Sequence, residues 1–452
     1  MNWNDLLSTV KLGPEETEPP EFARYPINEF EKDYNRIVSS AAFRRLQDKT
    51  QVFPLDKSDF VRTRLTHSIE VSTIARQLGI MISKNTTRFR PTDIDGNVAE
   101  DIASVLLCAG LLHDLGNPPF GHFGETTIGD WFQAHLDKIH YKERPLRAWL
   151  TDQMAADLEN FEGNAQALRI LVKSRHNAGI NLSSAVISTL VKYPTDSLSF
   201  NKRHPDIKRH KLGYFTAEES ALNTISETVG TADENGDLHR HPLTYMLEAA
   251  DDIAYATADL EDAFKKRLFT LDEFVEFFEQ SYDHNNITAH GSPEYYTNQL
   301  LINLKERREQ NKDSVAFSNW LNYTRRWLMF VAIYRFSSNY REIMDGVYTH
   351  DLFYNTNHSI TIEILKAAMG KFVFNSPGIL KLELSSQTIL SFLLEKFVHA
   401  VLYYDTEYQD TDHGYVQNKA DKKYLSIFPK TISKIILVQK HMTRDMIYIF
   451  GC

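Results

Sequence analysis

The stretch LLHDLGNPPFGHFGE, residues 111–125, carries most of the information about fold and chemistry in this chain. It ends an apolar, helix-like run, DIASVLLCAGLLHDLG, and then brings several polar side chains into one short window. These side chains are His113, Asp114, Asn117, His122 and Glu125. Two prolines and three glycines restrict the backbone between them to a defined path. A buried helix that ends in imidazoles and carboxylates indicates a metal or proton-transfer site.

The composition is that of a soluble globular protein. The 452 residues are 42% hydrophobic and 24% charged, enough for one large or two ordinary domains. No run of 18 apolar residues predicts a membrane span, and the first residues lack the pattern of a secretory signal. With only two cysteines, no disulfide framework is expected, so we expect a cytoplasmic protein. A net charge of -10 argues against a generally basic nucleic-acid-binding surface but leaves room for a local basic pocket.

Helical periodicity extends outward from the opening stretch in both directions. Helices are predicted from about residue 34 to 53, from 62 to 84, on both sides of residues 179–181, and through most of residues 242–400. No alternation of strands and helices and no P-loop is present. We therefore predict an all-α fold, with at most a small β hairpin at Phe353–Leu365 and around KLELSSQ, residues 381–387.

Other helices offer further metal ligands. His67 lies in the apolar segment RTRLTHSIEV, and Asp251 and Asp252 interrupt the apolar run LEAADDIAY. Each feature alone has a simpler explanation: a lone histidine is usually hydrogen-bonded in a core, and an acidic pair usually faces solvent. Buried carboxylates without partners are costly, however. Three helices that each carry such groups indicate one shared divalent-metal site.

These residues resemble a known family. The order His67, His113-Asp114, Asp251 is similar to the H…HD…D signature of HD-domain phosphohydrolases. Five segments resemble the bacterial deoxyguanosine triphosphate triphosphohydrolases more closely: RIVSSAAFRRLQDKTQVFPL, RTRLTHSIEV, LLHDLGNPPFGHFGE, FEGNAQALRIL and LTYMLEAADDIAYATADLEDA. The resemblance is strong over residues 30–270 and diffuse elsewhere, and it implies an HD-domain helical bundle with additional helices.

The resemblance also implies a reaction. Such enzymes hydrolyse a deoxynucleoside triphosphate, with dGTP the first choice here, to the deoxynucleoside and inorganic tripolyphosphate by water attack at the α-phosphorus. It implies one Mn²⁺ or Mg²⁺, and the two imidazoles favour a transition metal. The implied ligands are His67, His113, Asp114 and Asp251. His122 and Glu125 match the catalytic His-Glu pair of the family, with the general acid and the general base left unassigned.

Substrate contacts follow from the same resemblance. Asn117 and Lys211 match phosphate-contacting residues, and Arg64 matches a phosphate-binding arginine, three residues before His67 on the same helix face. Gln51 and Asp259 are expected to bind the 3′-hydroxyl, Val52 to pack on the sugar, and Tyr255 to exclude a 2′-hydroxyl. Base selection is not readable from the sequence. The candidates for it in the C-terminal half are Arg325, Arg326, Tyr334, Arg335 and Tyr340.

The expected organisation has three parts. Residues 1–30 form an N-terminal extended segment, and residues 31–270 form the HD-domain catalytic core with an inserted basic lid loop at about 193–212. Residues 271–452 form a helical C-terminal region that packs on the core. The last residues, RDMIYIFGC, resemble the start of a family motif that normally continues beyond its glycine.

The resemblance further implies a homo-oligomer, hexameric or tetrameric, with possible regulation by nucleotides or single-stranded DNA. Two alternatives remain open. One is an HD phosphohydrolase or phosphodiesterase that acts on another nucleotide. The other is a non-catalytic regulator that binds nucleotide or nucleic acid.

Overall fold

The computed structural model describes residues 1–13, 27–49, 51–53, 58–94, 96–141, 143–173, 180–402 and 419–427. It is all-α, as predicted, with one two-stranded hairpin among the described residues. The terminal RDMIYIFGC motif lies outside these residues. No helix in the described part of the chain has the length and apolar character needed to cross a membrane.

The N-terminal half supplies the helices around the opening stretch. They are α1 (Trp3–Leu6), α2 (Glu29–Ser39), α3 (Ala41–Arg44), α4 (Arg64–Phe89), α5 (Gly96–Leu112), α6 (Gly121–His135), α7 (Asp152–Glu159), α8 (Gly163–Lys173), α9 (Ser184–Leu190) and α10 (Glu219–Thr228). The antiparallel strands β1 (His140–Tyr141) and β2 (Arg144–Pro145) follow α6. Between Val191 and Phe215 the chain forms a long loop with one 3₁₀ turn, Ile207–Arg209, where the basic loop is predicted.

The C-terminal half is also helical. It contains α11 (Pro242–Ala254), α12 (Leu260–Lys265), α13 (Leu271–Gln280), α14 (Pro293–Gln310), α15 (Asp313–Ser338), α16 (Tyr340–Met344), α17 (Ser359–Met369), α18 (Pro377–Leu402) and α19 (Lys419–Ile427). Two π-helical turns, η7 (Tyr255–Asp259) and η9 (Gly370–Phe374), extend α11 and α17.

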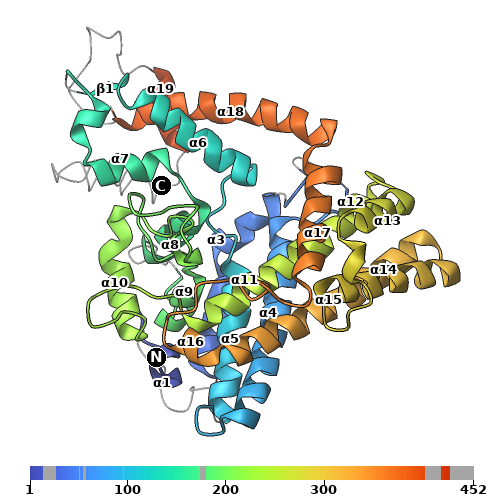
Figure 1. Ribbon diagram of the computed structural model, residues 1–452. Coiled ribbons are helices and arrows are strands. Elements are labelled where there is room, and N and C mark those ends of the chain that lie inside the picture. The colour runs from blue at the N-terminus through green and yellow to red at the C-terminus, as the bar shows by residue number, and fades with distance from the viewer. Residues whose placement is uncertain are drawn as a thin grey trace.

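The main core forms where α4, α5 and α11 pack together, with α15 beside them (Figure 1). The close approach of α4 and α5 depends on Gly110. A Cβ atom at this position would lie 2.4 Å from the Cα of Ser72, far inside van der Waals contact. This contact brings the end of α5, and His113 after it, against the first turns of α4.

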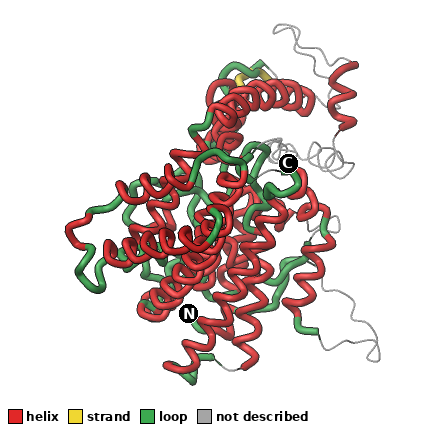
Figure 2. Tube along the Cα trace, turned by 90° about the vertical axis from the view of Figure 1, so that its right-hand side faces the viewer, coloured by secondary structure: helices red, strands yellow, loops and turns green. Residues whose placement is uncertain are grey.

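A smaller core lies beside the main one. It joins α6, the hairpin and α7 to α18 from the C-terminal region, through Trp131, Phe132, Leu158, Val398 and Leu402. In Figure 1 these elements form the upper layer, and the turned view of Figure 2 shows the same layer above the main bundle. A helix from the C-terminal region therefore packs directly on the segment that follows the opening stretch.

The predicted hairpin at Phe353–Leu365 and residues 381–387 is wrong. Residues from Ser359 form α17, and residues 381–387 lie in the middle of α18. The β-branched residues Thr361 and Ile362 fit a helix because they lie on its buried face together with Leu365, one turn further on. Tertiary burial outweighs their β propensity here.

The N-terminal prediction also needs correction. Trp3–Leu6 forms the helix α1, and Trp3 and Leu6 are buried, where an extended segment is predicted. The Trp3 Nε1 donates a hydrogen bond to the Tyr340 hydroxyl at 2.8 Å. Residues 1–13 are thus tied to the C-terminal half, whereas the PEETEPPEF part of the predicted segment lies outside the described residues.

Candidate active site

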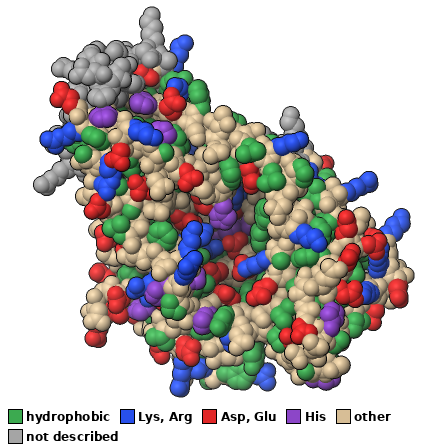
Figure 3. Space-filling model, turned by 45° about the horizontal axis from the view of Figure 1, so that its top comes forward, with side chains coloured by type: hydrophobic (Ala, Val, Ile, Leu, Met, Phe, Trp, Pro, Cys, Tyr) green, Lys and Arg blue, Asp and Glu red, His purple; other side chains and the backbone are tan. Residues whose placement is uncertain are grey.

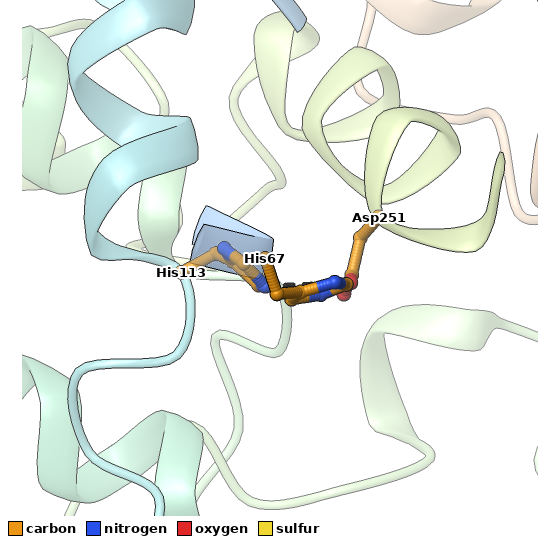
Figure 4. A group of neighbouring side chains, drawn as sticks. All are labelled: His67, His113 and Asp251. Carbon is orange, nitrogen blue, oxygen red and sulfur yellow. Dashed lines mark ion pairs between the residues drawn. The ribbon is translucent and has the colours of Figure 1, made fainter. Parts of the chain in front are cut away.

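Three side chains from three elements converge beside the opening stretch. His67 comes from α4, His113 from the turn after α5, and Asp251 from α11. One potential ligand atom from each lies within 4.8 Å of the others. Figure 4 shows the three side chains pointing toward one another. This arrangement confirms the prediction that separate helices bring these groups together.

The donor set fits a divalent metal ion. The two ring nitrogens of His67 and Nε2 of His113 are buried without a hydrogen-bond partner. Nδ1 of His113 lies 2.9 Å from the Gly110 carbonyl, so it carries the proton and leaves the Nε2 lone pair free. Both Nε2 atoms lie near Asp251 Oδ1, at 3.5 Å for His67 and 3.4 Å for His113. Buried ring nitrogens without partners are costly unless a ligand uses them, and a bound cation would take the place of a proton on His67.

Asp114 sits at the edge of this group. Its Oδ1 lies 3.6 Å from His113 Nε2, and its Oδ2 accepts a hydrogen bond from Arg64 Nη1 at 2.7 Å. Asn117, predicted to contact phosphate, donates its side-chain amide to Asp114 Oδ1. Burial alone would raise the pKa of Asp114, but the Arg64 guanidinium outweighs it and holds the pKa well below its usual range.

Lys192 neutralises the third ligand group. Its Nζ donates to Asp251 Oδ2 at 2.8 Å, so Oδ1 faces the histidines. Burial favours the neutral acid, but the Lys192 ammonium and His113 keep the pKa of Asp251 well below its usual range. Burial disfavours a charged His67, yet neighbouring carboxylates outweigh this effect and raise its pKa to about 9. Lys192 did not emerge from the sequence, because nothing local marks it.

His122 and Glu125 form a pair at the beginning of α6. His122 Nδ1 lies 2.6 Å from Glu125 Oε2, and 81% of the His122 side chain is exposed. The other carboxylate oxygen accepts the Gly163 backbone N–H at 2.9 Å, which anchors the acid to α8. Burial would raise the pKa of Glu125, but the bond from His122 lowers it below its usual range. The pair therefore combines a fixed carboxylate with an accessible imidazole.

The turn before this pair is strained. Phe120 has a φ of 68°, a left-handed conformation that is uncommon for a residue with a bulky side chain. Such strain persists only where surrounding contacts enforce it, and it is found often at functional sites.

A cavity of about 620 Å³ opens beside these groups, although His67 and Glu125 are not among the described residues that line it. Most of the predicted site residues line it: Gln51, Val52, Arg64, His113, Asp114, Asn117, His122, Lys211, Asp251 and Tyr255. Figure 3 shows a hollow on this face with histidine and acidic side chains inside it and Lys and Arg side chains nearby. The cavity is large enough for a nucleotide-sized ligand.

Asp259 is placed differently from its predicted neighbours. It is buried and does not appear among the described residues that line the cavity, and both its carboxylate oxygens lack a hydrogen-bond partner. Asp251, Tyr255 and Asp259 are four residues apart, the spacing of one face of a regular α-helix, but the chain adopts the π-helical turn η7 from Tyr255. Burial raises the pKa of Asp259 to about 7.

Several cavity residues were missed by the sequence interpretation. They are Phe120, Gly121, Phe123, Glu162, Asn164, Lys192, Tyr193, Glu248, Lys366, Phe374, Ile379 and Glu383. The last four come from the C-terminal half and carry no motif that could have marked them.

Conversely, none of the candidates for base selection is a described lining residue. Arg325 instead donates to the Thr257 hydroxyl, and 74% of Tyr334 is exposed.

Comparison with known proteins agrees with this geometry. The HD domain family matches residues 64–183. A deoxyguanosinetriphosphate triphosphohydrolase-like protein of Listeria monocytogenes is 44% identical over 403 residues, which covers 88% of this chain and 83% of the relative. The chain belongs to the deoxyguanosinetriphosphate triphosphohydrolase family.

More distant relatives carry related names. A deoxyguanosinetriphosphate triphosphohydrolase of Serratia proteamaculans is 32% identical, covering 82% of this chain and 76% of the relative. A triphosphohydrolase-like protein of Synechocystis is 33% identical, covering 89% and 87%. Membership in this triphosphohydrolase family identifies the chain as an HD-domain hydrolase. The HD match includes His67, His113, Asp114 and the His122–Glu125 pair, whereas Asp251 lies beyond it.

Proposed function

We propose that the protein hydrolyses deoxynucleoside triphosphates, dGTP first, to the deoxynucleoside and inorganic tripolyphosphate. The observation that carries this proposal is one cavity that is lined by His113 and Asp251 of the metal-ligand group, by His122, and by four cationic side chains. The names of the relatives support dGTP as the first choice.

A divalent ion would be held by His67, His113, Asp251 and Asp114. The buried, unpaired imidazole nitrogens support this assignment. Two nitrogen and two oxygen donors favour Mn²⁺ over Mg²⁺ on ligand softness. When bound, the ion supplies polarisation of the α-phosphate and helps to position the attacking water.

His122 would move the proton that this reaction requires. Attack of water at the α-phosphorus breaks the bond to the 5′ oxygen, and that oxygen must gain a proton while the water loses one. Glu125 occupies Nδ1 of His122 and so leaves Nε2 as the nitrogen for exchange with substrate or water. The high exposure of His122 in the cavity supports this role.

The charged substrate would be oriented by the cations of the cavity. Arg64 and Lys211 are the proposed triphosphate contacts, and Asn117 orients Asp114 beside them. Charge-assisted hydrogen bonds from guanidinium and ammonium groups are the usual way to hold phosphate oxygens.

The deoxyribose would be recognised on another wall. Gln51 and Asp259 are the proposed partners of the 3′-hydroxyl. Gln51 lines the cavity and its Oε1 has no hydrogen-bond partner, whereas Asp259, whose two oxygens are also unpaired, is buried outside the described lining. Val52 and Tyr255 would pack on the sugar, and the Tyr255 ring would leave no room for a 2′-hydroxyl. Selection against ribonucleotides would therefore be steric.

Anion-exchange analysis of products tests the proposal. Each of the four dNTPs and GTP is incubated with Mn²⁺, with Mg²⁺ or with EDTA. We expect deoxynucleoside and intact tripolyphosphate, fastest from dGTP and absent in EDTA. Monophosphate products would favour the phosphodiesterase alternative. Binding without turnover of any single dNTP or mixture would favour the regulator alternative.

A further inference from the structure

Lys366 brings a fourth cation to the cavity from the C-terminal half of the chain. It lies on α17, it lines the cavity, and 40% of its side chain is exposed. Its Nζ lies 2.8 Å from Asp252 Oδ1. No sequence motif marks this residue, and the HD match ends well before it.

The carboxylate of Asp252 accounts for the position of the Lys366 ammonium. It follows the proposed ligand Asp251 on α11 and lines the same cavity. Only 27% of the Asp252 side chain is exposed, and the Lys366 ammonium lies against its carboxylate. An uncompensated carboxylate here would be costly in the folded protein and would repel an incoming polyphosphate. The Lys366 ammonium stabilises the buried carboxylate and reduces its repulsion of a polyphosphate.

The same arrangement recurs around the cavity. Each described Lys or Arg that lines it is paired with one carboxylate: Arg64 with Asp114, Lys192 with Asp251, Lys211 with Glu162 and Lys366 with Asp252. The acids hold the cations in place before a ligand arrives. A lysine ammonium has three N–H donors, so a bond to one carboxylate leaves donors for a second anion.

We propose that Lys366 is a further substrate-binding residue, which donates to the triphosphate oxygens while Asp252 holds it at the cavity wall. This inference rests on the proposed function, because it takes the ligand to be a triphosphate. It assigns the C-terminal helical region a direct part in substrate binding, in addition to its packing on the core. A triphosphate carries about four negative charges, of which one divalent ion balances only two, so further cations are required.

The test compares inhibition by the two products. We expect Lys366→Met to weaken inhibition by tripolyphosphate, with Mn²⁺ present, roughly tenfold or more, the usual effect of losing a charge-assisted hydrogen bond. The KM for the dNTP should rise in parallel. Inhibition by the deoxynucleoside, which lacks phosphates, should not change. Lys366→Arg keeps the charge and should recover part of the tripolyphosphate affinity.

Lys305→Met serves as the matched control. Lys305 pairs with Glu279 at 2.9 Å on the surface of α14, far from any described cavity-lining residue in sequence. It should leave both inhibition constants unchanged. Equal inhibition of the wild type and Lys366→Met by tripolyphosphate would overturn the inference. It would also be overturned if the substitution weakened inhibition by tripolyphosphate and by the deoxynucleoside to the same extent, because that result indicates a structural role only.

The experiments distinguish failure of the Lys366 proposal from failure of the proposed function. If the wild type releases tripolyphosphate but Lys366→Met binds it normally, only the role of Lys366 is wrong. If the wild type releases monophosphates and does not bind tripolyphosphate, both proposals are wrong.

Discussion

At the scale of single residues, function depends on pairs in which one side chain fixes another. His122 is held by Glu125, Asp114 by Arg64 and Asp251 by Lys192, each through one hydrogen bond of 2.6–2.8 Å. Each pair leaves one atom of the functional group directed at the cavity. The sequence named the His122–Glu125 pair through its motif, but it indicated neither Arg64 as the partner of Asp114 nor Lys192 as the partner of Asp251.

Glu125→Gln tests the His-Glu pair. The amide keeps the size of the side chain and can still accept the Gly163 N–H, but its own N–H would face His122 Nδ1 and impose the wrong tautomer. We expect kcat to fall by a factor of about 10²–10⁴ while Mn²⁺ affinity, measured by calorimetry, is unchanged. Asp130→Asn, on the exposed face of the same helix, is the control. A wild-type kcat in Glu125→Gln would remove His122 from the mechanism.

Asp251→Asn tests the metal site. The amide oxygen is a weaker ligand and loses the ion pair with Lys192. We expect Mn²⁺ to raise the thermal midpoint of the wild type, because the ion joins three helices, and to have no such effect on the variant. If Mn²⁺ raised the thermal midpoint of the wild type and of Asp251→Asn equally, the ion would bind at a site that does not include Asp251.

At the scale of elements, the site depends on how closely α4 and α5 approach each other. Neither helix carries a complete site, since His67 belongs to one and His113 follows the other. The contact at Gly110 sets their separation. The π-helical turn η7 similarly changes where Asp259 lies relative to Asp251, and the four-residue spacing of Asp251, Tyr255 and Asp259 in the sequence gives no indication of it.

Gly110→Ala tests this contact. A Cβ atom would meet the Ser72 backbone, so the helices must move apart, at a cost of about 1–3 kcal/mol in the free energy of unfolding. We expect lower stability in urea denaturation and weaker Mn²⁺ binding. Gly96→Ala, where an added Cβ meets nothing within 4 Å, should lower neither. Full metal affinity in Gly110→Ala would show that the site tolerates a wider helix spacing.

At the scale of the whole molecule, distant segments are joined through buried polar groups. His241 precedes α11 and its Nε2 lies 3.0 Å from the Leu6 carbonyl of α1. His358 lies at the start of α17, against Tyr296 and Trp327. Burial lowers the pKa of each histidine to about 4, so both are neutral in the folded protein near pH 7.

These two histidines predict acid sensitivity. Between about pH 4 and 6.5 the unfolded chain binds protons at both positions and the folded protein does not, so stability rises with pH in this window. The two histidines should together lower the free energy of unfolding by a few kcal/mol from pH 7 to pH 5, whereas the raised pKa values of Asp252 and Asp259 oppose this fall in the wild type. The measurement is therefore the difference in pH slope between the wild type and a histidine variant. His358→Phe should reduce this slope in urea denaturation while leaving the aromatic cluster filled. An unchanged slope would contradict the assignment for His358.

The sequence by itself determined the helical class, the family and the residues with local motifs, because helical periodicity and ligand spacing are properties of short segments. It predicted that His67, His113 and Asp251 lie together, because each is a polar side chain in an apolar segment, whereas Asp114, the fourth predicted ligand, lies at the edge of this group. Only the tertiary structure decided the partners of these residues and the far wall of the cavity. Lys192, Asp252 and Lys366 meet through the packing of α9, α11 and α17 and their loops, and their burial and charge pairing arise only when those segments come together. The two misassigned strand segments have the same cause, because burial on α17 and α18 outweighs local propensity.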